Sequence, residues 1–219
     1  MYHRVLPDNL IKEDLNTGMA VNTSEFEKQI KILKSKYKIV SMDEFNQSVK
    51  KKKNHFLVTL TFDDGYKDNL THALPILEKF QVPATIYITT RFLEGGDVWM
   101  WWYELKHEIY SKSKLNFEFK NFHYNFLLEN YQKKEIVFKN LRKLFLDLES
   151  EEQIKLLEVI TGNKIRKNYA EICLNKEDVI NLDQNPLITI GSHSHNHLNL
   201  SVLEKEKLLY EVNQSTEIL

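Results

Sequence analysis

Two adjacent carboxylates, Asp63 and Asp64, directly follow an apolar and β-branched run at 56–62. Like charges side by side repel each other, so such a pair gains stability only where a cation binds or where one carboxylate takes up a proton. The alternative is a solvated turn, because Asp-Gly is a common turn dipeptide and Gly65 comes next. A motif this short does not by itself separate a turn from a metal or proton-transfer site.

Three histidines lie within five residues, at positions 193, 195 and 197, after a second apolar run at 187–190. A spacing of four residues lets His193 and His197 converge on one ion, either on one side of a helical turn or in a tight loop. His195 lies between them and is therefore expected to point elsewhere, into a cleft or to the surface. The alternative for all three is a histidine-rich surface loop.

One carboxylate and two imidazoles would together occupy three positions on a metal ion and leave others open for water and substrate. Such an ion lowers the pKa of a bound water and polarises a carbonyl, and the other aspartate of the pair could accept the water's proton. These donors suit Zn²⁺, Co²⁺, Ni²⁺ and Fe²⁺ alike. Oxygen chemistry at iron is therefore an alternative to hydrolysis.

The elements that must position these clusters alternate along the chain. The runs at 56–62 and 187–190 and the segment 84–90 predict strands, and the segment 69–80 predicts a helix. This alternation is typical of an α/β protein with a mostly parallel sheet. Ligand-binding residues in such folds gather at the carboxyl ends of strands, where both polar clusters are found.

Among the other segments, 2–6 and 38–40 predict further short strands, and several longer ones predict helices. Residues 96–185, rich in Lys and Glu, predict a helical insertion within a single domain spanning 1–219. Ser24 and Ser41, each followed three residues later by Glu, predict helix starts of the capping-box type. The last stretch, 202–219, predicts an amphipathic helix with these apolar positions: Leu208, Leu209, Val212 and Leu219.

Composition narrows the class of protein. The chain has 219 residues, of which 42% are hydrophobic, and this apolar content is too high for a disordered chain. Its 30 Lys+Arg are balanced by 31 Asp+Glu, so it has no excess positive charge to bind a nucleic acid backbone. Its single cysteine, Cys173, excludes an intrachain disulfide and a cysteine-based zinc site. No apolar run is long enough for a transmembrane segment, and no signal peptide is seen, so the chain as given predicts a cytoplasmic protein. If an upstream leader has been removed, an exported or membrane-associated protein is expected instead.

The two polar clusters resemble the motifs of a known family. Thr61-Phe62-Asp63-Asp64-Gly65-Tyr66 is similar to the first motif of the polysaccharide deacetylases, the NodB-homology or carbohydrate esterase family 4 group. His193-Ser194-His195-Asn196-His197 is similar to their second motif, and the segment 73–85 resembles the family's helix and next strand. The resemblance covers most of residues 1–95 and 186–219.

The resemblance implies a fold, a reaction and roles for particular residues. It implies a distorted (β/α) barrel of the NodB-homology type, and a hydrolase that removes N-acetyl groups from an amino-sugar-containing glycan or glycan precursor by breaking a linear amide C–N bond. Asp63 would be the catalytic base, and Asp64, His193 and His197 would hold a divalent metal, Zn²⁺ in the first place. The expected partner is an N-acetylated glycan.

The chain departs from the family pattern after His197, where the usual Arg, Asp and Leu-x-His motifs do not follow. The C-terminal part of the domain is therefore expected to be missing. Tyr2-His3-Arg4-Val5 resembles the N-terminal strand of the circularly permuted poly-N-acetylglucosamine deacetylases, and this resemblance assigns the general acid to His3. The alternatives are a His3 that only packs against the core, a small-amide hydrolase on the same scaffold, and a catalytically silent carbohydrate-binding module that retains the metal.

Overall fold

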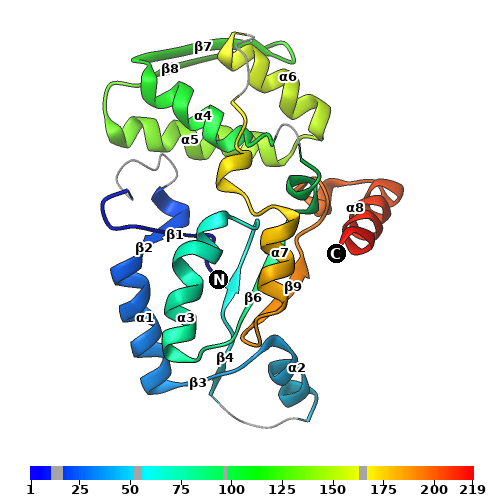
Figure 1. Cartoon of the computed structure of the whole chain (residues 1–219). Coiled ribbons are helices and arrows are strands. Elements are labelled where there is room, and N and C mark those ends of the chain that lie inside the picture. The colour runs from blue at the N-terminus through cyan, green and yellow to red at the C-terminus, as the bar shows by residue number, and fades with distance from the viewer. Residues whose placement is uncertain (11–16, 52–55, 96–97, 163–166) are drawn as a thin grey trace. The chain divides into compact units, whose positions relative to one another are not determined.

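The computed structural model of the chain describes residues 1–10, 17–51, 56–95, 98–162 and 167–219. These residues divide into two compact units (Figure 1). The first unit comprises Met1–Gly96, Ala170–His197 and Tyr210–Leu219, and the second comprises Asp97–Tyr169 and Leu198–Leu209. Of the predicted insertion at 96–185, residues 97–169 fall in the second unit and 170–185 in the first; its start at 96–97 and its stretch 163–166 lie outside the described residues.

The strands of the first unit pair in parallel, as the alternation of elements predicts. They are β1 (Arg4–Leu6), β2 (Ala20–Asn22), β3 (Lys38–Ile39), β4 (Leu57–Val58), β5 (Thr61–Phe62), β6 (Ala84–Ile88) and β9 (Ile188–Ser192). β1 pairs with β2, β3 with β4, and β5, β6 and β9 form one sheet in that order. The expected mixed α/β fold is thus confirmed, whereas the described strands form short sheets and no closed barrel among themselves.

Helices make up the rest of the first unit, and several of them share a buried apolar core with its strands. They are α1 (Thr23–Lys36), α2 (Met42–Lys50), α3 (Leu74–Phe80), α7 (Lys176–Asp183) and the part of α8 (Lys205–Ile218) from Tyr210 onward, with the short turns η1 (Thr17–Met19), η2 (Asn69–Ala73), η3 (Thr90–Leu93) and η4 (Ala170–Ile172). α7 belongs to this unit because Val179 and Leu182 join the same buried cluster as Ile188 of β9. The predicted helix over 69–80 is divided into the π-helical η2 and the α-helical α3, because Pro75 has no N–H to continue the α-helical pattern.

Helix caps show how closely local sequence sets the element bounds. The side chain of Ser41 accepts the amide of Glu44, so α2 begins where the capping box predicts. The prediction for Ser24 was wrong, since Asn22 caps α1 by accepting the amide of Glu25. Asn and Ser are comparably good N-caps, and the pattern alone did not choose between neighbouring candidates.

The N-terminal segment is fixed to the sheet beside β5. Tyr2 forms a parallel bridge to Phe62, with its amide donating to the carbonyl of Thr61 at 2.7 Å. The rings of Tyr2, Phe26 and Phe62 pack together with centroids 5.1–5.8 Å apart. Because β5 ends at Phe62, this cluster places His3 at the same edge of the sheet as the paired carboxylates.

The second unit consists of helices and a hairpin: α4 (Trp101–Ser111), β7 (Lys114–Phe119), β8 (Phe122–Leu127), α5 (Tyr131–Leu146), α6 (Ser150–Thr161) and η5 (Leu200–Val202), with the first residues of α8. Trp101 stacks on Phe145 at 4.5 Å in its core. The antiparallel hairpin departs from the expected all-helical stretch; its turn residues Lys120 and Asn121 both adopt positive φ, as a tight hairpin turn requires. Within the described parts of the chain, no helix has the length and apolar character needed to span a bilayer.

Candidate metal centre

The polar clusters meet because the strands before them belong to one parallel sheet. Asp63 and Asp64 follow β5, His193 follows β9, and β6 lies between these two strands. The carboxyl ends of parallel strands lie at one edge of a sheet, which is the usual place for a ligand site in such folds. The amide of His193 donates to the carbonyl of Ile88 at the end of β6, which holds the start of the histidine loop against that strand.

Three donor atoms converge at this edge. Asp64 Oδ1 lies 3.3 Å from His193 Nε2 and 3.0 Å from His197 Nε2. One ligand atom from each of the three residues lies within 4.8 Å of the others. Ligand atoms bound at about 2.1 Å to one divalent ion are separated by about 3.0–3.5 Å, so the two contacts of Asp64 fit such an ion.

The electrostatics of the cluster favour a positive charge beside Asp64. Burial alone would raise the pKa of Asp64, but hydrogen bonds from the two imidazoles hold it well below its ordinary value. Burial likewise works to lower the pKa of His193, yet its hydrogen bond to Asp64 raises that pKa overall. A buried carboxylate that stabilises a proton on a neighbouring imidazole presents the same field to a divalent cation.

Two of the three donor residues, and two of their neighbours, have positive φ angles. Asp64, Ser194 and His197 adopt φ angles of 74°, 63° and 59°, and Gly65 follows at 80°. Non-glycine residues in this region are uncommon, and such conformations cluster at functional sites. The site is therefore held in its geometry by the surrounding structure.

Asp63 and His3 lie beside the three donors. His3 Nε2 is 4.0 Å from Asp63 Oδ2. This distance is too long for a hydrogen bond but short enough for an electrostatic interaction. Burial lowers the pKa of His3, although the charges of Asp64 and Asp63 oppose this shift. The structure thus brings every predicted site residue to one edge of the first unit; their roles stay predictions.

Residues absent from the sequence prediction hold His3 in place. Asn69 Nδ2 donates to the carbonyl of His3 at 2.8 Å, and Asp68 accepts from Arg4 Nε at 2.8 Å and from the amide of Val5 at 2.7 Å. These contacts fix the backbone at His3 and on its C-terminal side. Asp and Asn after the glycine read in sequence as ordinary turn and helix-start residues, so no local signal distinguished them.

The expectation for His195 was wrong in part. It does point away from the ion site, but it is buried rather than surface-exposed, and its Nδ1 lies 3.0 Å from Thr90 Oγ1. The reason is that the loop from 193 to 197 folds back over η3, where the amides of Thr90 and Arg91 donate to the carbonyls of Ser194 and His195. His195 therefore belongs to the packing that supports the loop.

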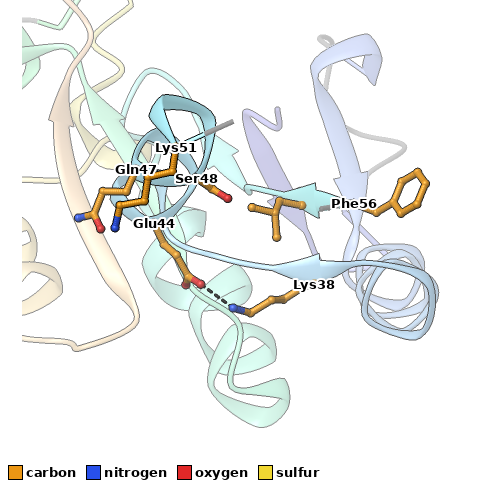
Figure 2. Close-up of a pocket in the computed structure, with 7 residues that line it drawn as sticks. Lys38, Glu44, Gln47, Ser48, Lys51 and Phe56 are labelled. Carbon is orange, nitrogen blue, oxygen red and sulfur yellow. Dashed lines mark hydrogen bonds and ion pairs between the residues drawn. The ribbon is translucent and has the colours of Figure 1, made fainter. Parts of the chain in front are cut away.

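A separate groove of the first unit lies on α2, β3 and β4 (Figure 2). Its lining residues are Lys38, Glu44, Gln47, Ser48, Lys51, Phe56 and Leu57. None of the predicted site residues is among them. Because β4 precedes β5 along one extended segment, the groove is at the opposite end of that segment from Asp63.

Comparison with known proteins agrees with this arrangement. The chain belongs to the polysaccharide deacetylase family, whose model matches residues 50–219. The family resemblance drawn from the two motifs is thereby confirmed. No curated protein matches the chain.

Two solved structures share the fold. The de-N-acetylase from Aggregatibacter actinomycetemcomitans is 16% identical, with a TM-score of 0.50 over 89% of this chain and 53% of that chain. The deacetylase PplD of Streptococcus pyogenes, solved in complex with acetate, is 17% identical, with a TM-score of 0.52 over 99% of this chain and 64% of that chain. The chain thus spans between half and two thirds of the length of these proteins.

Proposed function

We propose that the chain is a metal-dependent hydrolase that removes N-acetyl groups from an amino-sugar-containing glycan. The observation that carries this proposal is the buried carboxylate of Asp64, faced by His193 and His197 at 3.3 and 3.0 Å with a second carboxylate beside it. Membership of the polysaccharide deacetylase family supports the same reaction. A carboxylate and two imidazoles leave room for water and substrate, as a catalytic site requires.

Asp64, His193 and His197 would hold the ion, and their O and N donors suit Zn²⁺ as well as Co²⁺, Ni²⁺ and Fe²⁺. When bound, a divalent ion would make a water molecule more acidic and polarise the amide carbonyl. Asp64 keeps its negative charge at neutral pH because its pKa is lowered by the two imidazoles. The site therefore presents an ionised carboxylate to the ion over the whole neutral range.

Asp63 would act as the base. Its backbone amide donates to the carbonyl of Tyr2 at 3.0 Å, which holds it at the sheet edge next to Asp64. Its carboxylate would accept a proton from the water that attacks the acetyl carbon. Positioned general bases of this kind contribute about 10²–10⁴ in rate.

His3 would act as the acid for the leaving amine. Hydrolysis breaks the C–N bond, releases acetate and requires one proton on the sugar nitrogen. Burial lowers the pKa of His3, so the resting imidazole is neutral at neutral pH and must first take up a proton. Asp63 Oδ2, 4.0 Å from His3 Nε2, is near enough to pass on the proton that it accepts from water, directly after a small movement or through one bridging water.

The same proposal extends to the fold. The parallel strands of the first unit, with Tyr2 just before β1 bridged to Phe62 of β5, support a distorted barrel of the NodB-homology type. The stretch 96–185, most of which belongs to the second unit, would be an insertion into that domain.

Acetate release from N-acetylglucosamine oligosaccharides by the Zn²⁺- or Co²⁺-loaded chain tests the proposal. Asp63→Asn should lower the rate by about 10²–10⁴ while Co²⁺ still binds, because the base is lost and the proposed ligands remain. His3→Ala should also slow acetate release, and Asp43→Asn, an exposed aspartate on α2, should leave it unchanged. The proposal fails if the metal-loaded chain releases no acetate, or if Asp63→Asn keeps the full rate.

A further inference from the structure

A buried carboxylate on α8 contacts the histidine loop. Glu211 Oε2 accepts the backbone amides of His195 at 3.0 Å and Asn196 at 2.8 Å, and its Oε1 accepts Asn196 Nδ2 at 2.7 Å. The side chain is nearly inaccessible to solvent, since Glu211 is only 2% exposed. All three bonds therefore join one helix residue to two of the three residues between the proposed ligands His193 and His197.

The buried face of α8 is unusual for a surface helix. Such helices normally bury an apolar stripe, yet the buried residues of α8 are Glu211 and Ser215, which lie one turn apart on the same side. Ser215 Oγ lies 2.7 Å from Ser192 Oγ at the end of β9. A charge is costly to bury unless its hydrogen bonds are supplied, and here the loop supplies them.

The loop needs such support because its own backbone is strained. Ser194 and His197 both adopt positive φ. On one side the amides of Thr90 and Arg91 hold the loop carbonyls, as described above. Glu211 of α8 accepts hydrogen bonds from amides of the loop, whereas residues of η3 donate hydrogen bonds to its carbonyls. The loop is therefore fixed by two different elements.

We infer that Glu211 is a positioning residue of the metal centre, which fixes the loop so that His193 and His197 reach one ion together. The inference rests on the proposed metal site and adds to it a residue that contacts neither ion nor substrate. Outer residues that orient metal ligands typically contribute 10–100-fold to affinity. Removing the carboxylate should therefore weaken metal binding even though every proposed ligand is retained.

Co²⁺ titration of the full metal-free chain, followed by visible absorption, tests this inference without any enzymatic readout. Glu211→Gln keeps the size of the side chain but removes its charge and leaves one acceptor oxygen, instead of two, for the three N–H groups that now bind the carboxylate. It should raise the Kd for Co²⁺ by about 10–100-fold and change the Co²⁺ absorption bands. Asn196→Ala removes only the bond to Oε1 and should give a smaller loss in the same direction, which keeps the inference testable if Glu211→Gln folds poorly.

Two control variants lie on the same helix. Ser215→Ala removes the tie to β9 and should lower stability while changing the Kd by less than about threefold. Glu217→Gln, an exposed glutamate, should change neither quantity.

The outcomes separate the inference from the proposed function. A Kd unchanged in Glu211→Gln overturns the inference and leaves the metal site standing. Equal losses in Glu211→Gln and Ser215→Ala also overturn it, because they would show a general effect of loosening α8. If the unaltered chain binds no Co²⁺, the metal part of the proposed function falls together with the inference.

Discussion

Gly191, at the end of β9, gives a prediction whose size follows from the structure. It pairs with Tyr87 of β6, and a Cβ at this position would lie 2.6 Å from Tyr87 Cδ1 and 2.7 Å from Cε1. Carbon atoms in contact lie about 3.5–4.0 Å apart, so Gly191→Ala must displace the ring or the strand by about 1 Å. Overpacking of this kind costs about 1–3 kcal/mol, and we expect the free energy of unfolding to fall by that amount.

The displacement should also reach the candidate metal centre, because Gly191 lies two residues before His193. Urea denaturation of the metal-free chain measures the loss of stability, and Co²⁺ titration measures the effect on the site. Gly18→Ala is the matched control: a Cβ there meets no atom within 4 Å, so its effect should be neutral or slightly stabilising.

A double-mutant cycle isolates the contact with the ring. In a Tyr87→Ala background, Gly191→Ala should cost at least about 1 kcal/mol less than it does alone, since the clashing ring is gone. The steric reasoning is refuted if Gly191→Ala is as stable as the original chain, or if the cost is the same with and without the ring of Tyr87.

Two further predictions concern Cys173 and the binding of Co²⁺. Burial raises the pKa of Cys173 to about 12, so a disulfide reagent at pH 8 should label the native chain far more slowly than the unfolded chain. Because the thiol ionises in the unfolded chain first, stability relative to Cys173→Ala should fall as pH rises above about 8.5; a difference that does not change with pH would contradict the shift. Co²⁺ at about 100 times its Kd should raise the free energy of unfolding by about 2.7 kcal/mol, measured by urea denaturation. Asn tolerates the left-handed backbone conformation of Asp64, so Asp64→Asn should fold normally but lose most of the stabilisation by Co²⁺. An equal stabilisation of the original chain and of Asp64→Asn would exclude Asp64 as a ligand.

The candidate site could be predicted from sequence because its residue types are informative where they occur. Two adjacent aspartates after a buried strand, and histidines four apart after another, supply the residue types and the spacing that a divalent cation or a proton transfer needs. The parallel arrangement of β5, β6 and β9 then brings both clusters to one edge without further information. Both clusters could therefore be identified from local sequence, without knowing which distant residues they contact.

The helix at the C-terminus shows where local pattern failed. Its apolar residues Leu209 and Val212 are nearly half exposed, while Glu211 between them is buried. Hydrophobic periodicity assigns the buried face to apolar residues, because it counts only the gain from removing them from water. It does not include the hydrogen bonds that a buried glutamate on the helix accepts from backbone amides of another loop.

The contrast between the proposed ligands and the residues that support them has a common physical cause. Asp64, Ser194 and His197 adopt backbone conformations that cost about 1–3 kcal/mol each, and short loops have few contacts of their own to offset that cost. The offset must come from elements that are remote in sequence, here η3 through Thr90 and α8 through Glu211. Candidate site residues are therefore recognisable by type and spacing, whereas residues that hold them in a strained geometry resemble ordinary surface residues until the tertiary structure shows what they contact.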